Sequence, residues 1–210
     1  MPLVRETGVV ADPWQVVGDT DELPADGPVI ISHARWETER ERLIARPGPL
    51  GIRLKSDQHP ALIVDDLDRF DLIALEFPKF TDGRAYSSAR LLRERHRYQG
   101  ELRAVGNVLR DQLQFMRRCG FNSYALPEGV DVPAWLKALH SISVAYQPAA
   151  DATTPVLALR HRRNAPARDI AEEKATVKAG AEADARLSAA GPERDWSYDS
   201  STICAGYWAY

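Results

Sequence analysis

Between residues 29 and 126, five short apolar runs alternate with segments of helical periodicity, and this alternation constrains the fold more than any other feature. The apolar runs are VIIS (29–32), LGIRL (50–54), LIALEFP (72–78), LRAV (102–105) and NSYAL (122–126). Strands that alternate with helices at roughly 25 residues per unit are typical of a parallel sheet with right-handed crossovers. The sequence therefore predicts an α/β fold of about five βα units with a mainly parallel sheet. The pattern fits an open sheet and a partial TIM-like barrel equally well.

The segments on either side of this region have different compositions. Residues 1–27 are rich in Asp, Gly and Pro, which predicts an irregular lead-in or a short hairpin. The α/β domain is expected over residues 28–160. Residues 161–210 are rich in Ala and Glu and hold few large apolar side chains, so we expect a poorly structured extension that is a loose helix or disordered.

The overall charge gives no general attraction to polyanions. The formal net charge is −3 at pH 7, so neither nucleic acid nor an anionic membrane is an expected partner, and binding of an anion would need a local basic patch. No stretch approaches the roughly 20 apolar residues that span a bilayer. We therefore expect a cytoplasmic protein.

Cofactor signatures are missing from the sequence. Only Cys119 and Cys204 are present, far apart, and the five histidines are dispersed without an HExxH motif, so neither an iron–sulfur cluster nor a metal site is expected. There is no GxGxxG after a strand and no GxxxxGK[ST], so neither a Rossmann nor a P-loop nucleotide site is expected. Cys119 ends a helical segment on its apolar face, which favours a packing role over a redox role.

Several polar residues follow the predicted strands. In parallel α/β folds the loops after the strands meet at one edge, beside the amino ends of the helices. The residues expected there are His33, Arg35, Lys79, Asp82, Gly83, Arg84, Asn107, Arg110, Asp111 and Glu128. Residues 84–118 also contain nine arginines against three acids, an excess of 9 − 3 = 6 positive charges. We therefore predict an anion- or partner-binding edge formed by Lys79, Arg84, Arg103, Asn107 and Arg110.

Some of these residues also have plain structural interpretations. Asp82 and Asn107 are good helix N-caps, and Gly83 suits a turn. Arg103 is harder to explain in this way, because it interrupts a strand that should be covered on both faces. A buried guanidinium needs an acidic partner, for which Glu76 and Asp82 are the candidates.

The stretch FPKFTDGRAYSSARLLRERHRYQGELRAVGNVLRDQLQFMRRCGFNSYAL, residues 77–126, resembles an uncharacterised bacterial family, domain of unknown function 934. The resemblance extends from about residue 20 to about residue 160. Members carry the label of oxidoreductases involved in sulfite reduction, because they accompany sulfite reductase in assimilatory sulfur operons. The family's usual DGRGYS and AVGDVLRDQ motifs occur here with Ala85 in place of Gly and Asn107 in place of Asp.

The resemblance implies an accessory protein of assimilatory sulfate or sulfite reduction that binds an anion or a redox partner, such as sulfite reductase, at the strand-end edge. Two alternatives stay open. One is a small oxidoreductase or other enzyme acting on an anionic sulfur metabolite, with Asp82 or Asp111 as general acid or base. The other is a non-catalytic (βα) scaffold. Because two isolated cysteines cannot ligate the cluster that works beside siroheme, the chain is not expected to be the catalytic subunit of sulfite reductase.

Overall fold

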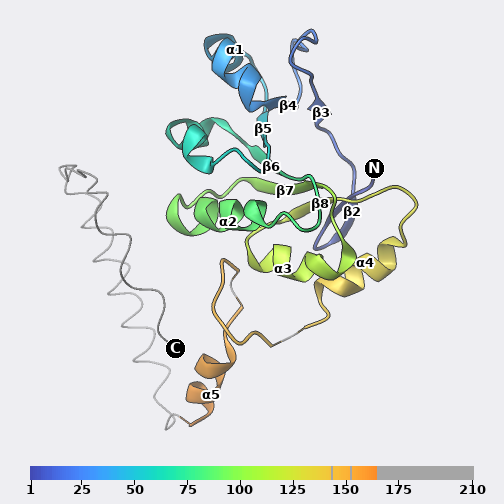
Figure 1. Cartoon of the computed structure of the whole chain (residues 1–210), viewed down its shortest axis with the longest axis vertical. Coiled ribbons are helices and arrows are strands. Elements are labelled where there is room, and N and C mark those ends of the chain that lie inside the picture. The colour runs from blue at the N-terminus through green and yellow to red at the C-terminus, as the bar shows by residue number, and fades with distance from the viewer. Residues whose placement is uncertain (143, 152, 165–210) are drawn as a thin grey trace, which may run out of the picture. The chain divides into compact units, whose positions relative to one another are not determined.

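The computed structural model describes residues 1–142, 144–151 and 153–164 (Figure 1). The chain divides into two units, Met1–Arg160 and His161–Tyr210. Most of the second unit, including Cys204 and the aromatic end of the predicted extension, lies outside the described residues. The first unit holds nearly all of the described residues.

An eight-stranded sheet forms this unit, in the order β2-β1-β8-β7-β6-β5-β4-β3. The strands are β1 (Leu3–Arg5), β2 (Gly8–Val10), β3 (Gln15–Val16), β4 (Val29–Ser32), β5 (Leu50–Leu54), β6 (Leu72–Phe77), β7 (Glu101–Gly106) and β8 (Ser123–Ala125). The five predicted strands are confirmed as β4 to β8. Strands β3 to β8 all run parallel, whereas β1 and β2 pair antiparallel at the β8 edge.

The strand order resolves the choice that the sequence left open. Strands β3 to β8 are neighbours in the order in which they occur along the chain, as in a TIM barrel and unlike a doubly wound sheet. With right-handed crossovers, this order places every connecting helix on the same face. Figure 1 shows the result, a curled half-barrel sheet with α1, α2 and α3 along one side.

The connections vary in regularity. They are α1 (His33–Ala45), the 3₁₀ helix η1 (Pro60–Arg69), α2 (Arg84–Arg90) continued by the π-helical turn η2 (Leu91–Arg95), and the 3₁₀ turn η3 (Arg110–Gln112) continued by α3 (Leu113–Arg118). Helices α4 (Val132–Leu139) and α5 (Val156–Asn164) follow β8. No helix in the described ranges has both the length and the apolar character needed to cross a bilayer.

The two faces of the sheet are buried by different parts of the chain. The helices cover a large core in which Ile31, Ile52, Leu75, Phe77 and Tyr124 are fully or almost fully buried. The alternate residues of the strands point to the other face. There Ile30, Leu72 and Ala74 form a small second cluster, against which Trp14 and Val105 pack.

The N-terminal residues bury that second face. After the β1–β2 hairpin pairs with β8, the chain reaches the opposite edge of the sheet, where β3 pairs with β4. Trp14 lies on the sheet so closely that a Cβ added at Gly51 would stand 3.2 Å from the indole ring. Residues 1–27 thus contain three strands, including a hairpin, and they complete the sheet at both edges.

Gly106 ends β7 in a conformation that other residues rarely adopt. Its φ is +91°, and an added Cβ would lie 2.5 Å from the backbone oxygen of Phe77 on β6. We expect Gly106→Ala to lower the free energy of unfolding by about 2–4 kcal/mol, because both the backbone and its neighbour would be strained. Gly83→Ala is the control, since Gly83 has φ −90° and nothing closer than 3.7 Å to its added Cβ. Urea unfolding, monitored by circular dichroism, measures the free energy of unfolding of both variants. Equal losses for Gly106→Ala and Gly83→Ala would contradict strain at Gly106.

Candidate functional site

The loops after β5, β6 and β7 are joined at the carboxyl edge of the sheet by three hydrogen bonds. Arg84 Nη2 donates to Ser56 Oγ (3.0 Å), the Asn107 amide donates to the Phe77 oxygen (2.7 Å), and Gln112 Nε2 donates to the Phe80 oxygen (3.3 Å). These contacts place Lys79, Arg84, Asn107 and Arg110 on adjacent loops. We call these four residues the basic edge.

Asp82 and Arg84 form a two-point ion pair within the basic edge. Arg84 Nε donates to Asp82 Oδ1 (3.0 Å), Nη2 donates to Oδ2 (2.7 Å), and the Arg84 amide donates to Oδ1 (3.2 Å). The Arg84 side chain nevertheless stays 61% exposed. The carboxylate thus fixes the direction in which the guanidinium points while leaving it accessible.

This pairing determines the protonation state of Asp82. Hydrogen bonds from the Arg84 side chain, assisted by Ser56 and the Arg84 amide, hold the pKa of the Asp82 carboxyl well below its usual range. A general acid or base works best with a pKa near the working pH. The geometry therefore argues against Asp82 as the acid or base of a reaction and suits it to orienting Arg84.

Lys79 and Arg110 differ from Arg84 in lacking an acidic partner. Both are exposed, and neither has a carboxylate oxygen within 4 Å among the described residues. Asp111, the second candidate acid, is exposed beside Arg110 at the start of η3, and its side chain makes no hydrogen bond within the described part of the chain. Asn107 is exposed and does not cap a helix, because η3 begins after Leu109.

Arg103 lies apart from the basic edge. Its side chain is only 3% exposed on the face of the sheet opposite the helices, where Nε donates to Glu101 Oε1 (3.0 Å) and Nη1 donates to Asp12 Oδ2 (2.8 Å). Ser123 Oγ also donates to Glu101 (2.6 Å). The proposed partners Glu76 and Asp82 were wrong, because Glu76 pairs with Arg53 (3.0 Å) and Asp82 pairs with Arg84. Arg103 is a buried structural cation.

The other arginines between residues 84 and 118 are also mostly neutralised. Five of the nine have a carboxylate within 4 Å, namely Arg84, Arg90, Arg103, Arg117 and Arg118. Arg93 donates to the carbonyl oxygens of Tyr98, Gly100 and Gly120. The local excess of arginine in the sequence therefore overstates the charge that this region offers to a ligand.

A cleft of about 380 Å³ opens on the same carboxyl edge, between the ends of β3 to β6. Its charged and polar lining includes Asp19, Ser32, His33, Arg53, Lys55, Gln58 and Glu76. Of these, only His33 was expected at the strand ends. The sequence did contain a signal for this cleft. Successive strands carry polar residues at the alternate positions that point to one face of the sheet, namely Ser32, Arg53, Glu76 and Arg103. Such a pattern indicates a face that helices do not cover.

The remaining expected edge residues have structural contacts. Arg35 is buried, and Nη1 donates to the Gly18 oxygen (2.5 Å), which ties the end of β3 to α1. Glu128 Oε1 lies 3.4 Å from the N-terminal amine. Neither residue belongs to the basic edge.

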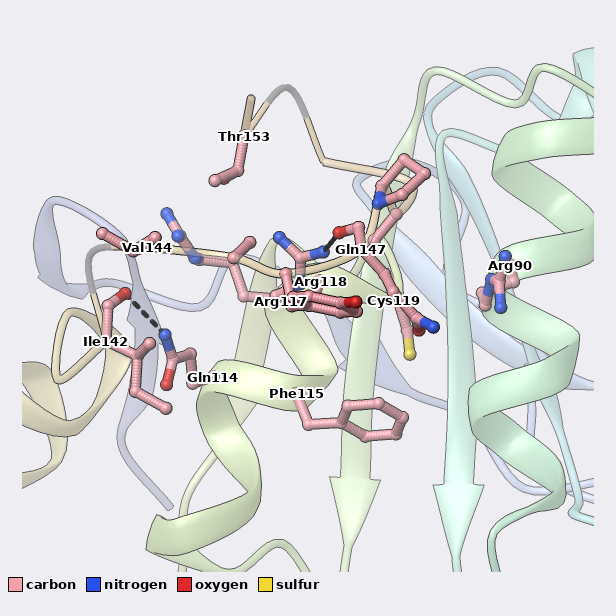
Figure 2. Close-up of a pocket in the computed structure, with 14 residues that line it drawn as sticks. Arg90, Gln114, Phe115, Arg117, Arg118, Cys119, Ile142, Val144, Gln147 and Thr153 are labelled. Atoms are coloured by element: carbon pink, nitrogen blue, oxygen red, sulfur yellow. Dashed lines mark hydrogen bonds between the residues drawn. The ribbon is translucent and has the colours of Figure 1, made fainter. Parts of the chain in front are cut away.

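A second cavity of about 390 Å³ lies away from the strand ends, between α3 and a segment that contributes residues 142, 144–149 and 153 (Figure 2). Gln114 Nε2 donates to the Ile142 oxygen (2.7 Å), and Arg118 Nη1 donates to Asp151 (3.2 Å), which hold this segment against α3. Cys119 lines the cavity, and burial raises the pKa of its thiol to about 11. A thiol with a raised pKa is a poor nucleophile, which agrees with the packing role predicted for Cys119.

Within residues 1–142, 144–151 and 153–164, no group of three or more His, Cys, Asp or Glu side chains is arranged to hold an ion.

Comparison with known proteins gives one match. A family model described as bacterial protein of unknown function (DUF934) matches residues 51–157, just over half of the chain. The matched range contains the whole basic edge together with Arg53, Lys55 and Glu76 of the cleft, whereas Asp19, Ser32 and His33 precede it. No curated protein and no solved structure matches the chain.

The ion pair with Arg84 predicts an unusual titration of Asp82. We expect this carboxylate to stay ionised through pH 4, where an ordinary Asp of pKa about 3.9 is half protonated. Because the folded-state pKa is lowered, the pair stabilises the fold above the unfolded-state pKa, and this contribution is lost as the pH falls towards the folded-state value. Carboxyl ¹³C NMR measures the titration. In Arg84→Met the Asp82 pKa should return towards its ordinary value, and an unchanged pKa would contradict the assignment.

Arg103 and Arg53 form a matched pair for measuring stability. Arg103→Met would remove the buried cation that lies between Asp12 and Glu101 and would leave the almost buried Glu101 with only the half-exposed Arg5, so we expect a loss of about 2–3 kcal/mol in the free energy of unfolding. Arg53→Met breaks a partly exposed pair with Glu76 and should cost less than about 1 kcal/mol. Urea unfolding of both variants tests the difference; a loss for Arg103→Met no larger than that for Arg53→Met would contradict the buried-charge argument.

Proposed function

The chain belongs to the DUF934 family of bacterial proteins of unknown function, and we propose that it is an accessory protein of assimilatory sulfate or sulfite reduction that docks an acidic partner protein at its basic edge. Sulfite reductase is the first candidate partner, because the family label links its members to sulfite reduction. The protein would then work in the cytoplasm. The observation that carries the docking proposal is that Lys79 and Arg110, on adjacent loops beside an oriented Arg84, have no carboxylate within 4 Å in the part of the chain that the structure describes.

The exposure of the basic edge favours a protein partner over a small anion. Neither of the two cavities includes Lys79, Arg84, Asn107 or Arg110 in its lining. Phe80 stands among these residues with 56% of its surface exposed. Arginine and aromatic side chains are enriched where interfaces derive their affinity, and unpaired surface cations accelerate the encounter with an acidic face.

The enzymatic alternative receives less support from this edge. It required Asp82 or Asp111 as general acid or base, and Asp82 is held ionised by Arg84. Asp111 has no neighbouring group that would orient it towards a substrate among the described contacts. A role in assembly, with the half-barrel as a rigid support for loops, agrees better with the hydrogen bonds that join the three loops.

The docking proposal predicts a charge-dependent interaction. We expect Lys79→Glu combined with Arg110→Glu to weaken binding to purified sulfite reductase at least about tenfold, because two attractive contacts become repulsive. Binding of the unmodified chain should also weaken between about 50 and 300 mM NaCl, as screening predicts. Biolayer interferometry with the full-length chain measures both effects.

A matched control reverses two charges at the other end of the strands. Arg69 and Arg95 are exposed, precede β6 and β7, and have no carboxylate within 4 Å among the described residues. Arg69→Glu combined with Arg95→Glu makes the same change in net charge, and it should leave binding unchanged. If both double variants lost the same amount of binding, net charge alone would explain the effect. If the Lys79/Arg110 variant lost no binding, the docking site would be refuted.

A further inference from the structure

We propose that the cleft between the ends of β3 and β6 is a binding site for a small two-ended metabolite with an oxyanion group at one end and an ammonium group at the other. Its volume of about 380 Å³ falls in the range of small-molecule sites, about 300–1,000 Å³. The site is separate from the basic edge, since it shares no residue with Lys79, Arg84, Asn107 or Arg110.

Lys55 supplies the positive end of the cleft. It follows β5 directly, lines the cleft, and has no carboxylate within 4 Å in the described ranges, whereas the neighbouring Arg53 is paired with Glu76. The amino end of α1 also meets the cleft at Ser32, His33 and Ala34. We place the oxyanion on the ammonium group of Lys55, and α1 adds only its first turns, because its helical geometry breaks at Glu39 (φ −118°, ψ 21°).

His33 gives independent evidence of a ligand. The residue is only 5% exposed and lines the cleft, yet its ring makes no hydrogen bond with any described residue. The closest acidic atom, Glu37 Oε2, lies 3.6 Å from Nδ1, which is too long for a hydrogen bond. The ring nitrogens thus make no hydrogen bond within the described ranges, and a ligand in the cleft would give them a partner.

Two carboxylates also line the cleft. Asp19 lies beside the amino end of α1, where Oδ1 accepts the Ser32 hydroxyl, and Glu76 lies on β6, where Oε1 is 3.0 Å from Arg53 Nη2. With two cations and two carboxylates, the lining has no net charge to attract a simple anion. It complements a molecule that carries both signs, and this is why we assign an ammonium group to the end of the ligand near Glu76.

The wall of the cleft is fixed before a ligand binds. Arg35 donates to the Gly18 oxygen and lies within 3.1 Å of Glu39, and Ser32 accepts the Arg35 amide (3.1 Å). On the other side, the Lys55 amide donates to Gln58 Oε1 (2.8 Å), and the Gln58 amide donates to the Lys55 oxygen (3.0 Å). A site built in advance loses less entropy on binding.

Two matched pairs of probes test both ends of the assignment. Phosphoethanolamine and taurine carry an oxyanion and an ammonium group, whereas ethyl phosphate and ethanesulfonate carry the oxyanion alone. Calorimetry with the full chain should show binding of phosphoethanolamine, taurine or both with Kd below about 10 mM, and at least about fivefold weaker binding of the matched probe without the ammonium group. The two arms distinguish a phosphate from a sulfonate ligand. No binding by any probe, or equal binding within each pair, would overturn the proposal.

Single substitutions locate the probes within the cleft. Lys55→Met should weaken probe binding at least about tenfold, and Lys55→Arg should retain most of it, because a charge-assisted contact is lost in the first variant only. Glu76→Gln should remove the preference for the probes with an ammonium group. Lys79→Met should leave probe binding unchanged, and Lys55→Met should leave partner binding unchanged, so this proposal and the docking proposal fail separately. Unchanged probe binding in Lys55→Met would overturn the site.

Discussion

The handedness of the crossovers is the constraint on which the rest of this structure depends. Because β3 to β8 follow one another in space as they do in sequence, right-handed connections place every connecting helix on one face. A closed barrel would bury the other face inside itself, but a half-barrel leaves it open. Here the N-terminal residues cover it, with Trp14 over the apolar cluster and Asp12 on Arg103. The lead-in is therefore part of the core.

The same constraint explains how the chain uses its arginines. On the face without helices, the buried Arg103 is paired with carboxylates, whereas Arg35 and Arg93, on helical segments, donate to carbonyl oxygens. Arg35, Arg93 and Arg103 act in this way as internal cross-links. Lysine is used differently, since two of the three lysines in residues 1–142, Lys55 and Lys79, stand at the carboxyl edge without an acidic partner. Both lysines are thus available to a ligand or partner at the carboxyl edge, while Arg69 and Arg95 are available in the same way at the opposite end of the strands.

The sequence predicted the elements well and their long-range partners poorly. Strand positions depend on local runs of apolar residues, so β4 to β8 were predicted close to their observed bounds. The order of strands and the partners of buried charges depend on contacts between distant residues. Asp12 and Arg103, for example, are 91 positions apart, and no local pattern connects them. The cleft escaped prediction for the same reason, because its lining comes from four strands that become neighbours only in the folded sheet.

The basic edge and the cleft are distinct, but they share one structural element. Residues 55–58 form a tight turn that carries Lys55 and Gln58 into the cleft lining, while Ser56 of the same turn accepts a hydrogen bond from Arg84. Arg84 is in turn held by Asp82, so a short chain of polar contacts runs from the cleft wall to the exposed guanidinium. The two surfaces therefore meet at the backbone of this turn, although no charged side chain belongs to both.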